Sequence, residues 1–360
     1  MKKMEEIANH IFCGDCLDVM AEFPDNSIDS IVTDPPYGLS FMSKSWDRGV
    51  PGIPFWEEAL RVVKPGAHML AFGGTRTHHR LMTAIEDAGW EIRDCIMWIY
   101  GSGRPKSLDI SKAIKKIEIE NAEEWDGWGT GLKPAYEPII LARKPVGGPI
   151  AENVLIWGCG GINLDICRVE SESSTNPATL GRWPANIILD EDTGKLLDLQ
   201  SGDDCGNKAP VKSGTSGKSK GIYGNFAQKG CNPQTFRGDT GGASRFFYCA
   251  KASCSERGED NDHPTVKPLA LIRYLIKLIT PPKGITMDMF AGSGTAAEAA
   301  LDEGVTFVCI DIEQHHVDIA QNRIKDHKFI KSISKVNSDS EVSISTVKCI
   351  SEIQTGIMDF

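Results

Sequence analysis

Apolar strands alternate with amphipathic helices at both ends of the chain, and this alternation limits the possible fold more than any other feature. Over residues 11–100, strand-like apolar segments are separated by helical ones, such as a helix over 55–64 followed by a strand over 67–72. The alternation returns over residues 269–327. Strands that alternate with helices form a mostly parallel sheet with helices on both faces. The sequence therefore predicts an α/β fold with a doubly wound sheet.

The first motif of the chain, Asp34-Pro35-Pro36-Tyr37, directly follows a predicted buried strand over 30–32. Proline fixes its own φ and disfavours a helical conformation of the residue before it, so the carbonyl groups here remain able to accept hydrogen bonds. A carboxylate, rigid carbonyls and an aromatic ring together can hold a planar exocyclic amine and stack on its base. Because Asp-Pro is also common in ordinary turns, this motif alone does not decide the function.

The second motif, Gly292-x-Gly294, lies between a predicted strand and a predicted helix. Its glycines let the backbone approach a ligand, and Asp311 after the next strand can hold ribose hydroxyls. The spacing also fits an NAD-binding enzyme, but Asp288 ahead of the glycines favours a ligand with an ammonium group, such as S-adenosylmethionine. Ligands of doubly wound sheets bind where the strand order reverses. The two motifs meet there if the strands before Asp34 and Asp288 are neighbours.

Several segments resemble the DNA amino-methyltransferases that modify adenine N6 or cytosine N4, especially phage and prophage members with the catalytic motif first. These segments are 34–37, 61–66, 133–138, 244–248, 263–268 and 290–295. The resemblance covers about residues 10–327 and implies a circularly permuted, Rossmann-like class I methyltransferase with S-adenosylmethionine as its cofactor. Met289 departs from the family pattern, which usually has proline there.

The resemblance also implies roles for single residues. The catalytic residues would be Asp34, Pro35, Pro36 and Tyr37, with Tyr37 stacking on a base flipped out of DNA. The cofactor would be held by Asp15 at its adenine, Asp311 at its ribose, Asp288 and Lys267 at its methionine moiety, and further by Thr265, Phe290, Gly292, Gly294 and Thr295. Taken alone, Asp15 could instead be a helix N-cap and Lys267 a solvated charge in a first helical turn.

A basic segment stands out in a chain whose net charge is −10. Residues 205–255 carry eight basic side chains and one acidic side chain, with aromatic residues between them. This pattern is the electrostatic footprint of a nucleic-acid contact, although a flexible soluble loop is the alternative. By resemblance, residues 145–255 would form an irregular target-recognition insert. Its predicted DNA contacts are Lys218, Lys220, Lys229, Arg237 and Arg245.

The composition limits the organisation and the location of the protein. We predict a catalytic half over 1–144, the insert over 145–255, a cofactor-binding half over 256–330 and a weakly structured tail over 331–360. Eleven cysteines without a signal peptide indicate reduced thiols and a cytoplasmic location. No apolar stretch reaches membrane-spanning length, so we expect no membrane contact. Cys-x-x-Cys occurs without a second pair at zinc spacing, so no metal site is predicted.

The predicted function is a site-specific DNA methyltransferase that transfers a methyl group from S-adenosylmethionine to adenine N6 in double-stranded DNA. Cytosine N4 is the alternative, because enzymes of this kind that modify cytosine more often have serine where this chain has Asp34. A catalytically silent DNA-binding protein and a protein or RNA amide methyltransferase are less expected. Double-stranded DNA is the expected partner, a cognate restriction enzyme is a second candidate, and the expected oligomeric state is a monomer or homodimer.

Overall fold

The fold was analysed in a computed structural model of the chain. It describes residues 2–39, 47–103, 105–117, 121–169, 181–202, 241–250 and 266–339, with side chains described up to residue 327. The predictions for Thr265, Lys218, Lys220, Lys229 and Arg237 therefore fall outside the described residues.

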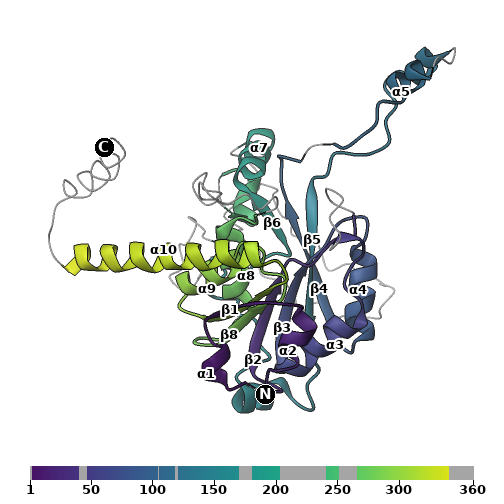
Figure 1. Ribbon diagram of the computed structural model, residues 1–360. Helices are drawn as coiled ribbons and strands as arrows, with labels where there is room; N and C mark the ends of the chain where they lie inside the picture. Colours follow the sequence, from purple (N-terminus) through teal and green to yellow (C-terminus); the bar gives the residue numbers. More distant parts are fainter. Residues whose placement is uncertain are drawn as a thin grey trace, which may run out of the picture.

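A nine-stranded sheet in the order β1-β9-β8-β2-β3-β5-β4-β6-β7 forms the centre of the fold (Figure 1). The strands are β1 (His10–Cys13), β2 (Ile28–Thr33), β3 (Val63–Phe72), β4 (Glu91–Ile99), β5 (Tyr136–Arg143), β6 (Ile187–Asp190), β7 (Tyr248–Ala250), β8 (Ile285–Asp288) and β9 (Thr306–Asp311). Neighbouring strands are parallel except at β5, which is antiparallel to both β3 and β4. The prediction of a mostly parallel sheet is confirmed. The strand β5 was not predicted from the sequence, because Pro138 interrupts its apolar run and proline is rare in central strands.

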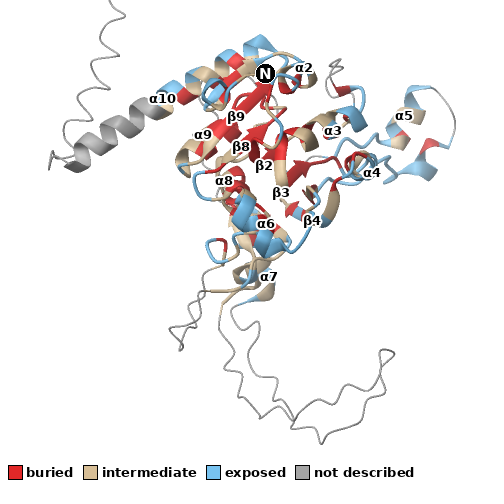
Figure 2. Cartoon of the chain, turned by 90° about the horizontal axis from the view of Figure 1, so that it is seen from below, coloured by how far each residue is buried: buried red, intermediate tan, exposed pale blue. Residues whose placement is uncertain are grey.

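Helices cover both faces of the sheet, and two hydrophobic clusters fill the layers between them. One cluster joins the sheet to α8 (Leu269–Ile279), α9 (Thr295–Asp302) and α10 (Gln314–Asp339). The other joins it to α1 (Met4–Ile7), α2 (Cys16–Met20), α3 (Ile53–Val62) and α4 (His78–Asp87). Figure 2 shows the central strands buried between these layers. The doubly wound arrangement is therefore confirmed.

The strand order reverses between β8 and β2. These two strands are parallel neighbours, and β9 and β1 continue the sheet on one side while β3 continues it on the other. Both strands end at the same edge, so the residues that follow them face each other. The condition for the two sequence motifs to meet is thus fulfilled.

The predicted insert over 145–255 is not irregular throughout, because its described residues contain α6 (Ile150–Trp157), β6, α7 (Glu191–Ser201), the short 3₁₀ helix η4 (Ala243–Phe246) and β7. β6 extends the sheet beyond β4, and β7 pairs with β6. These strands have only four and three residues, and strands this short leave almost no periodicity in the sequence. The described part of the insert therefore belongs to the central sheet.

The C-terminal helix is longer than predicted. We expected a weakly structured tail from residue 331, whereas α10 continues to Asp339. No glycine or proline interrupts residues 314–339, so nothing in that segment forces the helix to end. α10 packs against β1, which pairs with β9, so the first and last strands among the described residues are neighbours. This arrangement agrees with the permuted order implied by the resemblance.

One helical segment stands apart from the layers. α5 (Ile110–Lys116) and the 3₁₀ helix η3 (Ala122–Trp125) lie on an extension between β4 and β5 that projects away from the sheet (Figure 1). Among the described residues, no helix has the length and apolar character that crossing a membrane requires.

Candidate active site

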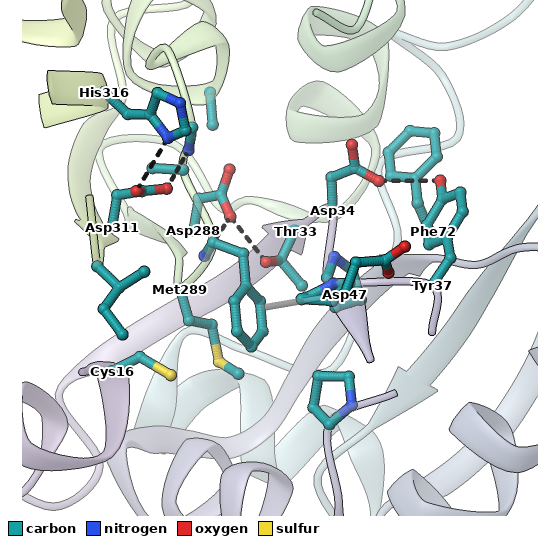
Figure 3. A pocket seen from close by; sticks show the side chains of 18 of the residues that line it. Cys16, Thr33, Asp34, Tyr37, Asp47, Phe72, Asp288, Met289, Asp311 and His316 are labelled. Atoms are coloured by element: carbon teal, nitrogen blue, oxygen red, sulfur yellow. Dashed lines mark hydrogen bonds and ion pairs between the residues drawn. The ribbon is translucent and has the colours of Figure 1, made fainter. Parts of the chain in front are cut away.

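A cavity of about 470 Å³ lies at the edge where β2 and β8 end (Figure 3). Both sequence motifs line it, together with the ends of β1 and β9. The predicted site residues that it brings together are Asp15, Asp34, Pro35, Pro36, Tyr37, Lys267, Asp288, Phe290, Gly292, Thr295 and Asp311. A single cavity is therefore lined by all of the predicted catalytic residues and by most of the predicted cofactor-binding residues.

Asp288 is a buried carboxylate at the centre of this edge. Its Oδ1 accepts hydrogen bonds from Thr33 Oγ1 at 2.7 Å and from the Phe290 backbone N–H at 3.1 Å. Burial nevertheless raises the pKa of Asp288 to about 7, because removal from water disfavours the charged form more than these hydrogen bonds favour it. An ammonium group in the cavity would stabilise this carboxylate, which fits the methionine end of S-adenosylmethionine.

Asp311 connects the glycine loop to the end of β9. Its Oδ2 accepts a hydrogen bond from the Gly292 backbone N–H at 2.7 Å, and its Oδ1 accepts one from the Glu313 backbone N–H at 2.9 Å. The His316 Nδ1 lies 3.3 Å from the same Oδ1 (Figure 3). Asp311 thus fixes the loop conformation besides lining the cavity, and its predicted contact with ribose stays a prediction.

Asp15 caps the N-terminus of α2, since its Oδ1 accepts a hydrogen bond from the Leu17 backbone N–H at 2.9 Å. It also lines the cavity. Asp15 is therefore both a helix N-cap and a residue of the cavity wall. Its contact with the adenine of the cofactor stays a prediction.

Gly294 does not line the cavity but has a structural reason to be glycine. Its φ is +82°, in the left-handed region, and a Cβ built there would lie 2.6 Å from the Ala320 Cβ on α10. Gly292 also has a positive φ, of +50°, and does line the cavity. The two glycines of the motif thus differ. Gly292 lines the cavity, whereas Gly294 permits close packing of α9 on α10.

Gly294→Ala is expected to destabilise the protein by about 2–4 kcal/mol, because left-handed strain and overpacking against Ala320 add up. Gly304→Ala is the matched control, since Gly304 follows the other end of α9 with a φ of +67°, and a Cβ added to it would meet no atom within 4 Å. That control is expected to cost only about 1–2 kcal/mol. Urea unfolding of both variants measures the difference, and equal losses would contradict the packing role of Gly294.

Asp34 is held in a network of charged and polar side chains. Lys267 Nζ lies 2.6 Å from Asp34 Oδ2 and 3.3 Å from Glu137 Oε2. The Tyr37 hydroxyl lies 2.9 Å from Asp34 Oδ1 and 2.8 Å from Glu137 Oε2. Lys267 is only 11% exposed, so it is not a solvated charge in a helical turn. Lys267 therefore contacts the Asp34–Tyr37 motif directly, and its predicted place beside the cofactor stays a prediction.

The network fixes the charge of its members. Burial lowers the pKa of Lys267, but the carboxylates of Asp34 and Glu137 outweigh this effect and raise it above its ordinary value. Burial and the same two carboxylates raise the pKa of the Tyr37 hydroxyl. At neutral pH the network therefore contains a charged lysine and a neutral tyrosine. The predicted stacking of Tyr37 on a flipped base stays a prediction.

Three acidic residues that line the cavity, Asp47, Glu137 and Glu313, were not predicted from the sequence. Asp47 accepts hydrogen bonds from the backbone N–H groups of Gly38 at 2.7 Å and Leu39 at 3.2 Å, and so holds the chain that follows Tyr37. Glu137 lies on β5 and faces Asp34 through the network. An acid inside an apolar strand is the signal that could have revealed Glu137, whereas nothing in the sequence around Asp47 indicates its role.

Arg245 is the predicted DNA-binding residue that falls within the described part of the chain. It lies in η4, outside the cavity, with its guanidinium 4.3 Å from the centre of the Phe246 ring. Arg182 stacks on the same ring at 5.0 Å. A contact between Arg245 and DNA stays a prediction.

Comparison with known proteins decides the family. A family model described as DNA methylase, of the N6/N4 methyltransferases, matches residues 28–322. The chain belongs to this DNA methylase family. The Type II methyltransferase M.HindIII of Haemophilus influenzae is 22% identical over 362 residues, which cover 87% of this chain and 94% of that protein. The putative methylase YubD of Escherichia coli K12 is 38% identical over 86 residues, covering 22% of this chain and 37% of YubD.

Solved structures of methyltransferases are also similar to the chain. The S-adenosylmethionine complex of M1.HpyAVI has a TM-score of 0.44 and 17% identity, covering 87% of this chain and 98% of that one. The cytosine-N4-specific PvuII DNA methyltransferase has a TM-score of 0.46 and 15% identity, covering 86% and 84%. Family membership, together with the sheet order, confirms a Rossmann-like, S-adenosylmethionine-dependent DNA methyltransferase.

Proposed function

We propose that this DNA methylase transfers the methyl group to adenine N6 in double-stranded DNA, with Asp34 at the reacting amine. The observation that carries the proposal is the cavity shared by Asp34 and Asp288 at the ends of two adjacent strands. An amine held at Asp34 and a cofactor held at Asp288 would face each other across this space. Positioning of the two reactants accounts for a large part of such a rate acceleration.

The residues of the cavity divide the work between cofactor and amine. Asp288, the loop at Gly292 and Asp311 would hold S-adenosylmethionine, which supplies an electrophilic methyl group when bound. Asp34 and the Pro35 carbonyl would accept hydrogen bonds from the amine. An aromatic amine is a weak nucleophile because its lone pair is delocalised into the ring. These hydrogen bonds return electron density to the nitrogen and stabilise the positive charge that develops on it.

The methyl group is transferred by direct displacement, from the sulfur of the cofactor to the nitrogen of the amine. The nitrogen lone pair forms the new N–C bond, and the electron pair of the broken S–C bond stays with sulfur. The proton that the nitrogen then loses passes to Asp34 and on to water. Asp34 therefore acts first as a hydrogen-bond acceptor and then as a proton acceptor, and it needs an oxygen free to face the amine at both stages.

We favour adenine because the chain has aspartate at position 34, where similar cytosine-N4 enzymes more often have serine. Cytosine presents the same kind of amine, conjugated to a ring nitrogen, so Asp34 and the Pro35 carbonyl could bind either base. The base edge beyond the amine would meet Tyr37 and the segment held by Asp47. Those contacts, together with pocket size, would set the preference.

Product analysis tests the proposal. The purified protein is incubated with duplex DNA and S-adenosylmethionine carrying a labelled methyl group, and the DNA is digested to nucleosides that are then separated. The label is expected in N6-methyladenine. Label confined to N4-methylcytosine would contradict the adenine preference and leave the family assignment unchanged.

The remaining predictions on partners and organisation belong to the same proposal. The similarity to a Type II methyltransferase supports a cognate restriction enzyme as a companion activity. We also propose that residues 145–255 recognise the target, that the enzyme acts as a monomer or homodimer, and that it is cytoplasmic. The division into a catalytic half over 1–144 and a cofactor-binding half over 256–330 is part of this proposal.

A further inference from the structure

Both carboxylate oxygens of Asp34 already have partners. Oδ2 forms an ion pair with Lys267 Nζ at 2.6 Å, and Oδ1 lies 2.9 Å from the Tyr37 hydroxyl. Figure 3 shows the Tyr37 hydroxyl directed at Asp34. Each carboxylate oxygen can accept two hydrogen bonds, so a target amine that enters the cavity competes with Lys267 and the Tyr37 hydroxyl for Asp34.

Glu137 offers Lys267 and the Tyr37 hydroxyl another acceptor. Its Oε2 is 2.8 Å from the Tyr37 hydroxyl and 3.3 Å from Lys267 Nζ, so neither group has to move far to contact Glu137 alone. The glutamate is held on β5, where it pairs with Trp98 of β4, and its side chain is 20% exposed. Its position on a central strand keeps this second acceptor in place while the cavity fills.

Two aromatic rings lie near the ammonium group of Lys267. Its Nζ lies 5.4 Å from the centre of the Tyr37 ring and 4.9 Å from the centre of the Phe72 ring. Aromatic faces attract a cation in a partly desolvated site. The ammonium can therefore shift toward Glu137 without losing its favourable surroundings.

We propose that Glu137 is a positioning residue that takes over Lys267 and the Tyr37 hydroxyl from Asp34 when the target amine enters. This inference rests on the proposed methylation of an amine at Asp34. It adds a second carboxylate to the site, one that acts through Lys267 and Tyr37 instead of touching the base.

The charges of the network support this role. Two carboxylates and one ammonium give the site a net charge of −1, and positive charge develops on the nitrogen during transfer. Without Glu137, Lys267 would have Asp34 as its acidic partner within the network and would neutralise it. The attraction between Asp34 and the developing charge would then be lost, because electrostatic stabilisation of this kind depends on the charge aimed at the reacting atom.

Glu137→Gln is therefore expected to lower the single-turnover rate constant of methyl transfer by about 10–100-fold, the range for a hydrogen bond to a charged group. The dissociation constants for cofactor and DNA are expected to stay near the wild-type values, since neither ligand is bound through Glu137. Glu57→Gln, an exposed change on α3, is the matched control. A wild-type rate constant in Glu137→Gln would overturn the inference.

A double variant distinguishes positioning from simple structural support. Adding Lys267→Met to Glu137→Gln removes the cation that holds Asp34 and restores a net charge of −1. The double variant is expected to react about 10-fold or more faster than Glu137→Gln alone. If Glu137 only stabilised the fold, losing Lys267 as well would slow the reaction further, and that result would overturn the inference.

Two further measurements separate this inference from the proposed function. If Asp34→Ala retains activity, the proposed catalytic site is wrong whatever Glu137 does; an inactive Asp34→Ala with a fully active Glu137→Gln overturns the role of Glu137 alone. A crystal structure with DNA and the non-reactive analogue sinefungin is expected to place Lys267 Nζ on Glu137, with an Asp34 oxygen on the amine. Lys267 still paired with Asp34 beside a bound base would contradict the exchange.

Discussion

Replacing Asp34 by alanine is expected to lower the rate constant of methyl transfer by about 10²–10³-fold, the usual loss when one positioned electrostatic group is removed from an active site. The reason is that the amine would keep the Pro35 carbonyl but lose the carboxylate that stabilises its developing charge. The fold should survive, because Lys267 keeps Glu137 as a partner at 3.3 Å. Single-turnover methylation of duplex DNA measures the rate constant directly.

Cofactor binding provides the internal control for this variant. Asp34 follows the end of β2 whereas Asp288 is the last residue of β8, so the dissociation constant for S-adenosylmethionine is expected to change little in Asp34→Ala. Asp18→Ala, an exposed change on α2 that lies outside the cavity, serves as the matched variant and should retain full activity. Turnover near the wild-type rate in Asp34→Ala would show that the carboxylate takes no part in catalysis.

The elements around the two motifs could be predicted because their sequence signals are local. The alternation predicted over 269–327 is present as α8, β8, α9, β9 and the first part of α10. Apolar runs of this kind end at Asp, Gly or Pro, which interrupt regular structure. The sequence left the adjacency of β2 and β8 as a condition for the two motifs to meet, and the parallel pairing of these strands fulfils it.

The parts that sequence reasoning missed depend on contacts between distant segments. β5 pairs with β3 and β4 in antiparallel directions, and no periodicity in Tyr136–Arg143 states which strands it will join. Glu137 becomes part of the site only through that pairing. The contacts of Lys267 with Asp34 and Glu137 were not predicted, because they depend on how β2 and β5 assemble, whereas its expected place at the methionine end of the cofactor stays a prediction. These contacts form only when the strands assemble into the sheet, so they cannot be predicted from any one segment of the sequence.

The sequence also did not determine which neighbours require the residues found at positions 15 and 294. A helix N-cap and a cofactor contact need the same acid at the same place, so the sequence left both interpretations open for Asp15, and the structure shows the cap at the wall of the cavity. For Gly294, the motif suggested approach to a ligand, whereas the nearest obstacle to a side chain is Ala320. Spacing predicted that glycine is needed there but not which neighbour requires it.

Asp288→Asn is expected to raise the dissociation constant for S-adenosylmethionine about 10–100-fold at about pH 8, because a neutral amide cannot balance the charge of an ammonium group. Asparagine preserves the size of the side chain and can still accept the hydrogen bonds from Thr33 and Phe290. Isothermal titration calorimetry measures the change, and Asp18→Asn provides the exposed control.

The role of Asp288 also predicts how cofactor affinity changes with pH. Burial raises the pKa of Asp288 to about 7 from its ordinary value of 3.8. Lowering the pH from about 8 to about 6 protonates the carboxyl group, so cofactor affinity of the wild-type protein should fall over that interval. The difference between wild type and Asp288→Asn isolates the contribution of the Asp288 carboxyl group. An affinity of wild type that is flat from about pH 6 to about pH 8 would contradict the role of Asp288.

The same pKa predicts how the cofactor-free protein responds to pH. A carboxyl group whose pKa is higher in the folded state than in the unfolded state favours folding below the unfolded value, and this contribution is lost as the pH rises through the folded value. The protein without cofactor should therefore lose stability between about pH 4 and about pH 7 through Asp288, and Asp288→Asn should lose less. Thermal unfolding of both proteins across this range measures the difference. Because bound cofactor would supply the missing positive charge, saturating S-adenosylmethionine should stabilise wild type more than the variant, and equal stabilisation would place the ammonium group elsewhere in the cavity.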